Sequence, residues 1–188
     1  MTEAALHYEL TQDRLDNGLQ VVVAPDAAAP GVAVNLWVEV GSADEAPGRT
    51  GFAHLFEHLM FQGSAQVASG EHMATIESLG GTVNATTSAD RTNYFETVPR
   101  GALDLALWME SDRFASLAIT PENFEAQRQV VKEEKRQRYD NQPYGDLLEL
   151  LTAQHFTPEH PYGHLTIGSM ADLDDASLED VAAFFGAW

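Results

Sequence analysis

The sequence predicts an α+β fold in which helices pack on one face of a largely antiparallel sheet. Up to Val98, short segments rich in β-branched residues and bounded by turn signals are typical of strands, with two helical stretches among them. From Pro99 onward, apolar residues recur at helical spacing instead. Strands first and helices later, with a helical insertion, indicate the α+β class.

The length and composition bound the size and the partners of this fold. A chain of 188 residues supports one substantial hydrophobic core and is too short for two ordinary domains, so we expect a single domain over residues 1–188. The apolar content of 44% is that of a globular protein. With 10 basic and 29 acidic residues the net charge is −19, which disfavours a nucleic-acid partner or an anionic membrane surface.

The chain contains no cysteine, so a metal site would have to be built from histidine and carboxylate side chains. Residues Met1–Asp13 lack a basic segment followed by an apolar one, and no apolar run approaches the length that crosses a membrane. We therefore expect a cytoplasmic protein that does not bind membranes.

The N-terminal part is expected to form three strands. Leu6–Thr11 and Leu19–Ala24 are joined by Asp16-Asn17-Gly18, a hairpin turn signal. Gly31–Val40 alternates valine and leucine with smaller or polar residues, which is the period of a strand with one buried face. A polar loop, Gly41–Arg49, follows.

The middle of the chain mixes helices and strands. The first expected helix is Gly51–Phe61, and the second, Gly70–Leu79, ends at Gly80-Gly81, a common helix terminator. Thr82–Ser88 and Thr92–Val98 are then expected to pair as two strands.

The C-terminal part is expected to be helical. Ala102–Ala115 carries a leucine-rich pattern, and Thr120-Pro121 is an N-cap followed by proline at the first helical position, opening a helix to about Asp140. A short helix is expected at Asp146–His155, and Ser177 begins a capping box for a last helix that runs to Trp188.

The first of these helices carries the most informative motif, His54-Leu55-Phe56-Glu57-His58. It is the reverse of the zinc peptidase order His-Glu-x-x-His, in which two histidines bind the metal and the glutamate acts on a water. On a helix, His54 and His58 lie about 40° apart and Glu57 about 60° from His54, so all three reach one ion. The alternative is a solvated helix face, because the apolar residues form a stripe on the opposite side.

Catalytic zinc sites use three protein ligands, and Glu134 is the predicted third. On the helix that begins after Thr120, angles around the axis are counted from Phe124. Phe124, Val130 and Val131 then define a predicted buried face centred at about 310°. Glu134 falls at about 280°, within that face, and Glu133 falls at about 180°, toward solvent. A carboxylate on a buried face is costly unless it is paired or bound to metal. The alternative for Glu134 is an ion pair with an arginine.

Gln127 lies seven residues before Glu134 on the same face, where it is expected to hydrogen-bond or orient a ligand. An interior polar residue at a helix bend is the alternative. The histidines outside the motif are expected to have ordinary surface or packing roles; these are His7, His72, His155, His160 and His164.

Over nearly its whole length, the chain resembles the pitrilysin/insulinase family of inverted-zincin metallopeptidases. Five motifs occur in the order typical of that family. They are Leu15-Asp16-Asn17-Gly18-Leu19, the segment Gly51–Leu59, Asn84-Ala85-Thr86-Thr87, Val130-Val131-Lys132-Glu133-Glu134, and His160-Pro161-Tyr162-Gly163 before Gly168.

The resemblance implies one bound Zn²⁺ per chain, with His54, His58 and Glu134 as ligands. It makes Glu57 the catalytic carboxylate, and it implies that a peptide binds as an added strand along Asn84-Ala85-Thr86. Family members often have a second glutamate where this chain has Gln127, so the chain departs from the family pattern there.

The expected function is that of a zinc endopeptidase that hydrolyses peptide bonds in unstructured or short polypeptides, with Glu57 as general base. The alternative is a non-catalytic subunit that binds polypeptide without cleaving it. The family domain normally continues past the last helix and is paired with a similar one. We therefore expect residues 1–188 to be a truncated catalytic half that needs a second homologous domain or subunit.

Overall fold

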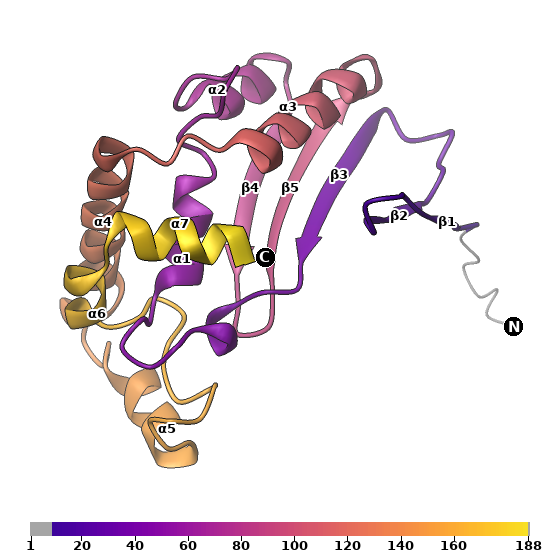
Figure 1. The fold of residues 1–188 in the computed structure, drawn as a ribbon. Coiled ribbons are helices and arrows are strands. Elements are labelled where there is room, and N and C mark those ends of the chain that lie inside the picture. The colour runs from indigo at the N-terminus through magenta and orange to yellow at the C-terminus, as the bar shows by residue number, and fades with distance from the viewer. Residues whose placement is uncertain (1–8, 188) are drawn as a thin grey trace, which may run out of the picture. The chain divides into compact units, whose positions relative to one another are not determined.

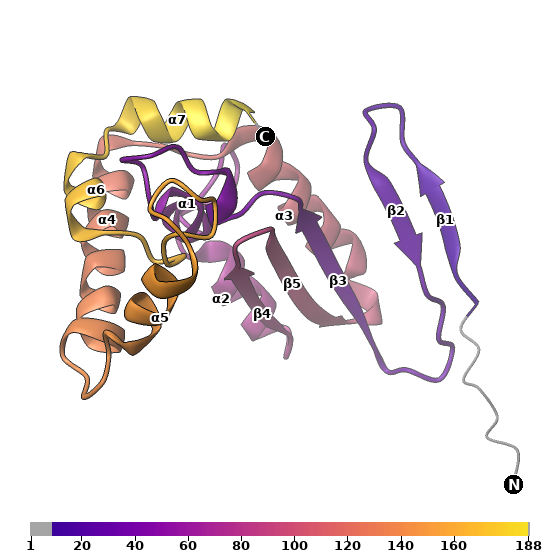
Figure 2. The same ribbon diagram turned by 90° about the horizontal axis from the view of Figure 1, so that it is seen from below.

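A three-stranded sheet forms the centre of the larger part of this protein, for which a computed structural model describes residues 9–187. The strands are β3 (Gly31–Val38), β4 (Thr82–Thr87) and β5 (Thr92–Pro99), in the order β3-β5-β4. Figure 2 shows neighbouring strands running in opposite directions. The chain divides into two compact units, Met1–Gly31 and Val32–Trp188, and each is described separately.

The first unit contains a hairpin of β1 (Thr11–Arg14) and β2 (Gln20–Val23). Its turn is the predicted one, with Gly18 at a φ of 93°. Of the predicted first strand, Leu6–Thr11, residues 6–8 lie outside the described part; among the described residues, pairing with β2 begins at Thr11 and runs to Arg14. The turn fixes the pairing of Arg14 with Gln20, so polar residues enter the ladder in place of the expected apolar ones.

The helices of the second unit follow the predicted order (Figure 1). They are α1 (Phe52–Leu59), α2 (Glu71–Ser78), α3 (Leu103–Ser116), α4 (Pro121–Lys135), α5 (Leu147–His155), α6 (Met170–Asp175) and α7 (Leu178–Ala187). The fold is therefore α+β, as predicted. Over the described part of the chain, no helix combines the length and the apolar character needed to cross a membrane.

Three local features differ from the sequence predictions. The predicted loop after β3 contains a 3-10 turn at Ser42–Asp44. The α4 helix ends at Lys135 and continues to Asp140 only as a π-helical turn. The α6 helix was not predicted, although Ser169 caps it by accepting the N–H of Asp172 at 3.0 Å.

The main core surrounds α1, which lies between α4 and β4 (Figure 1). Leu55 and Leu59 of α1 pack with Val131 of α4 and Leu173 of α6, and all four side chains are essentially inaccessible. Val130, predicted to share this buried face, is instead 47% exposed. A second cluster, with Ile76, Val98, Ala102 and Ala106, joins α2 and α3 to the sheet.

We predict that Leu55→Ala destabilises the protein by about 2–5 kcal/mol, because it leaves a cavity at a position with 0% exposure. Leu150→Ala on α5 is the matched control: Leu150 is 55% exposed, and about 0.5 kcal/mol is expected there. Urea unfolding of the zinc-free protein measures both values. Equal losses in the two variants would contradict this description of the core.

Candidate metal centre

The α1 helix begins at a glycine and presents three polar residues on one side. Gly51 is the N-cap residue with a φ of 91°, a left-handed conformation that favours glycine. From this start, His54, Glu57 and His58 emerge on one face, while Leu55 and Leu59 enter the core. The apolar stripe predicted from the sequence thus anchors the helix and leaves the polar face free for chemistry.

Three side chains from α1 and α4 converge at this face. The Nε2 atoms of His54 and His58 lie 3.7 Å and 3.4 Å from Oε2 of Glu134, and ligand atoms of all three residues lie within 4.8 Å of one another. Two ligand atoms about 2.1 Å from a tetrahedral Zn²⁺ are about 3.4 Å apart. Two imidazoles and one carboxylate at this spacing therefore fit a zinc ion.

His54 is held in the form that binds metal. Burial, followed by repulsion from His58, lowers the pKa of His54 from 6.5 to about 4, while the Glu134 carboxylate opposes this shift. Metal binding requires the neutral imidazole. At neutral pH His54 therefore has no proton to lose before it coordinates a metal.

Arg138 holds the other side of the Glu134 carboxylate. Its Nη1 forms an ion pair with Oε1 of Glu134 at 2.8 Å, which leaves Oε2 directed toward the two histidines. An arginine partner was predicted only as an alternative to metal binding, but the structure allows both. Arg138 itself was not predicted, and its spacing of four residues from Glu134 is the sequence signal that could have identified it.

Glu57 is oriented from the sheet. The hydroxyl of Thr87, the last residue of β4, donates a short hydrogen bond to Oε2 of Glu57. Burial raises the pKa of Glu57, and the Thr87 bond lowers it. A carboxylate with a raised pKa is suited to accepting and returning a proton near neutral pH. Thr87 lies in the motif Asn84-Ala85-Thr86-Thr87, but no role was predicted for it.

The strand β4 forms one edge of the sheet, and its backbone groups alternate in direction. The Ser88 N–H donates to the Arg91 carbonyl at 2.8 Å, which makes Ser88 and Arg91 a hydrogen-bonded pair. Such pairs alternate along an antiparallel ladder, so the backbones of Asn84 and Thr86 are hydrogen-bonded to β5, whereas that of Ala85, opposite Tyr94, is not. The backbone of Ala85 therefore faces the open edge, where the Asn84 side chain accepts its N–H at 2.9 Å. Of the three predicted substrate-binding residues, Ala85 is the one whose backbone groups face the open edge, and peptide binding there stays a prediction.

The remaining predicted positions lie on α4. Gln127 is half-buried, and within residues 9–187 no side-chain hydrogen bond joins it to a ligand, so its role stays a prediction. Glu133 is exposed and pairs with Arg136 at 3.1 Å and Gln137 at 3.1 Å. Helical phase thus separated the two adjacent glutamates as the sequence analysis expected.

A second group of metal-binding residue types is buried between α2, β5 and α3. Nε2 of His72 lies 3.1 Å from Glu96 and 3.9 Å from Glu110. Arg113, however, donates to both oxygens of Glu110, at 2.8 Å and 2.6 Å. A guanidinium already supplies the positive charge there, so this group is a buried ion-pair network that joins the helices to the sheet.

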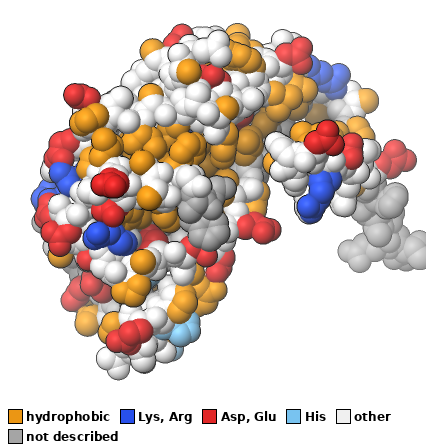
Figure 3. Space-filling view, in the orientation of Figure 1, with side chains coloured by type: hydrophobic (Ala, Val, Ile, Leu, Met, Phe, Trp, Pro, Cys, Tyr) orange, Lys and Arg blue, Asp and Glu red, His pale blue; other side chains and the backbone are white. Residues whose placement is uncertain are grey.

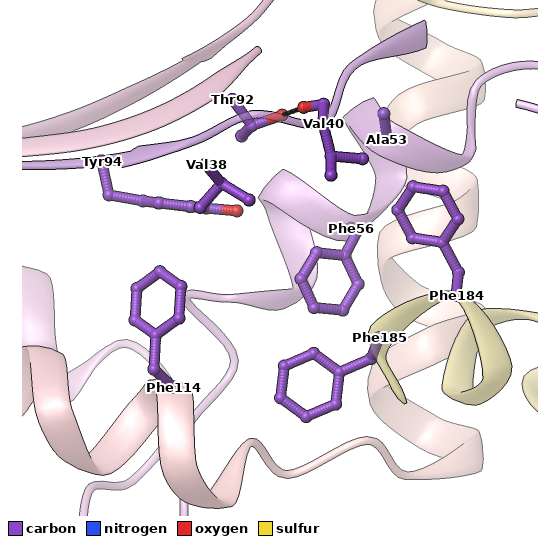
Figure 4. Close-up of a pocket in the computed structure, with 9 residues that line it drawn as sticks. All are labelled: Val38, Val40, Ala53, Phe56, Thr92, Tyr94, Phe114, Phe184 and Phe185. Carbon is purple, nitrogen blue, oxygen red and sulfur yellow. Dashed lines mark hydrogen bonds between the residues drawn. The ribbon is translucent and has the colours of Figure 1, made fainter. Parts of the chain in front are cut away.

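An apolar cavity of about 340 Å³ lies against Ala53 and Phe56 of α1 (Figure 4). Its wall is largely aromatic and comes from both sheet and helices; the lining residues are Val38, Val40, Ala53, Phe56, Thr92, Tyr94, Phe114, Phe184 and Phe185. Figure 3 shows hydrophobic side chains gathered in the same region, where α3 and α7 meet the strands. With so few polar groups, it is not a second reactive site.

Comparison with known proteins agrees with the site geometry. The family described as insulinase (peptidase family M16) matches residues 20–167. The chain belongs to this family. A zinc protease named PqqE from Helicobacter pylori is 37% identical over 174 residues, which cover 90% of this chain and 38% of that protein.

Solved structures of M16 proteins have the same fold. The crystal structure of a protease from Helicobacter pylori superimposes with a TM-score of 0.91 at 35% identity, over 95% of this chain and 43% of that one. Pitrilysin superimposes with a TM-score of 0.85 at 25% identity, over 98% of this chain and 20% of its own. The chain thus spans less than half the length of these relatives.

We predict that the ring of His54 titrates with a pKa of about 4 in zinc-free protein, because burial disfavours the imidazolium. Ring ¹⁵N chemical shifts recorded between pH 3 and 8 measure this value. Titration of His54 near pH 6.5 would contradict the burial of this ring.

Proposed function

We propose that this chain is the catalytic half of a zinc-dependent endopeptidase. The observation that carries the proposal is the convergence of His54, His58 and Glu134 beside Glu57, at the end of an open sheet edge. The names of the M16 relatives as zinc proteases support it. In this proposal the two histidines and Glu134 hold one Zn²⁺, and Glu57 is the catalytic base.

Bound zinc would supply a Lewis acid that polarises the scissile carbonyl and acidifies a water molecule. The residues of the chain do the rest. Glu57 takes the proton from the attacking water and returns it to the leaving amine, and its raised pKa suits both transfers. Thr87 keeps the carboxylate of Glu57 directed to one place, and Arg138 does the same for Glu134.

The substrate in this proposal is an extended polypeptide that adds to β4. The Ala85 backbone would form hydrogen bonds with the peptide backbone, which give affinity with little demand on sequence. Because β4 ends at Thr87, beside Glu57, a peptide on this edge passes the proposed zinc site. Unstructured or short polypeptides are thus the proposed substrates.

We propose that a second homologous domain or subunit completes the enclosure around the substrate, since this chain spans 38% of the Helicobacter pylori zinc protease. A cytoplasmic location is proposed from the sequence alone. Cell fractionation tests the location, and activity measured with and without the candidate partner tests the need for a second domain.

Glu57→Gln is predicted to reduce peptide hydrolysis about 10²- to 10⁴-fold while zinc stays bound, because Gln keeps the shape but accepts no proton. A quenched fluorescent peptide measures hydrolysis, and metal analysis measures zinc per chain. The matched control is Glu77→Gln, on an exposed position of α2, which should change neither quantity.

Full hydrolysis by Glu57→Gln with zinc bound would remove Glu57 from its proposed role. A parent chain that binds zinc and peptide but cleaves nothing, even with its candidate partner, would instead favour a non-catalytic peptide-binding subunit.

Glu134→Gln is predicted to weaken zinc binding about 10- to 100-fold or more, because it removes the charged ligand of a three-ligand site. Competition with a chromophoric chelator measures the zinc dissociation constant. Glu133→Gln, one residue away and facing solvent, is the control and should bind zinc like the parent. Equal affinity in both variants would exclude Glu134 as a ligand.

A further inference from the structure

The start of α1 is capped by a carboxylate from outside the helix. Gly51, the N-cap residue, has no side chain with which to accept the free N–H groups of the first turn. Glu45 does so instead: its two oxygens accept the N–H of Gly51 at 2.9 Å and of Ala53 at 2.7 Å. The Glu45 side chain is 0% exposed, and Ala53 directly precedes His54.

The segment that carries this carboxylate is tied to the other side of the site. The N–H groups of Ser42 and Ala43 donate to the carbonyls of Ser88 and Ala89, at 3.1 Å and 2.8 Å. At Gly41, a Cβ atom would lie 2.3 Å from the Ser88 carbonyl oxygen, so the close approach requires glycine. Residues 41–45 therefore form a strap from the end of β4 to the start of α1.

His164 holds the buried carboxylate in place. Its Nε2 lies 3.0 Å from Oε2 of Glu45, and it also hydrogen-bonds the backbone of Ser42. Burial raises the pKa of Glu45, whereas His164 and the two helix amides lower it. An expected surface or packing histidine is thus the partner of a fully buried acid.

A separate anchor holds the same end of α1 from α6. The Thr50 N–H and hydroxyl both donate to Asp172, at 2.8 Å and 2.6 Å. This contact fixes the helix start to the core, but it does not reach β4. Of these two anchors, the strap of residues 41–45 is the one that connects the start of α1 to the end of β4.

We propose that Glu45, held by His164, is a positioning residue that sets the place of α1 relative to β4 and α4. The carboxylate fixes the first turn of a helix that is only eight residues long and bears His54, Glu57 and His58. A shift of that turn moves the two histidine Nε2 atoms away from Glu134 and moves Glu57 away from Thr87. This inference rests on the proposed zinc site, and it assigns no chemical step to Glu45.

The test compares Glu45→Gln with Glu71→Gln. Glu71 also accepts a backbone N–H at a helix start, from Ala68 at 2.7 Å, but it lies at the start of α2 rather than α1. We expect both variants to lower the melting temperature of zinc-free protein, and only Glu45→Gln to weaken zinc binding, by about tenfold. Chelator competition measures the dissociation constant.

The histidine series provides a second comparison, which also applies if Glu45→Gln does not fold. His164→Ala is expected to weaken zinc binding in the same direction by a smaller factor. His164→Gln, which retains a hydrogen-bond donor, is expected to restore most of the affinity. Rescue of this kind distinguishes a contact with Glu45 from a general loss of packing.

Ring resonances of His54 and His58 in zinc-free protein separate this inference from the proposed function. We expect them to shift in Glu45→Gln and His164→Ala and not in Glu71→Gln. Unchanged resonances, or parent-like zinc affinity in Glu45→Gln and His164→Ala, would overturn the positioning role while leaving the zinc site intact. A parent chain that binds no zinc would overturn the proposed function, and the ring shifts would still decide whether Glu45 positions α1.

Discussion

The packing of α1 against α4 is the contact on which the rest of the site depends. His58 and Glu134 are far apart in sequence, and nothing local brings them together. Leu55 and Leu59 on one helix and Val131 on the other form the buried contact that does so. Because close-packed side chains leave little freedom for sliding, the polar faces above this contact meet at a fixed spacing. The geometry of the candidate metal centre is thus a consequence of apolar packing.

Burial shifts the pKa values of His54 and Glu57 in opposite directions. It keeps His54 neutral by lowering its pKa, and it raises the pKa of Glu57. The hydrogen bond from Thr87 limits the effect of burial at Glu57, because it favours the charged carboxylate. One partly buried site thereby holds a neutral imidazole and a carboxylate of raised pKa side by side.

Local patterns predicted much of this arrangement because helices and strands impose their own periods. The helical period distinguished Glu134 from Glu133, and alternation located β3. Val130 was misplaced because the buried side of α4 is centred elsewhere. Phe124, Val131, Lys132 and Lys135 are buried, and the two lysines lie about 140–160° around the helix from Val130, which is exposed.

The contacts of Thr87, Arg138, Glu45 and His164 were not predicted as functional. Most of them join elements distant in sequence, so the chain folds them together through packing that no local pattern encodes. The spacing between Glu134 and Arg138 was the one local signal among them. The family motifs include positions such as Thr87, but the hydrogen-bond partners of these residues are seen only in the folded structure.

The open edge of β4 must meet two opposing demands. Exposed strand edges pair readily with other chains, and proteins usually protect them. Here the Asn84 side chain occupies the outward N–H of Ala85. An incoming strand would have to displace that internal bond to reach this N–H. The bond therefore lowers the gain from strand addition at this position, both for a second copy of the chain and for the proposed peptide substrate.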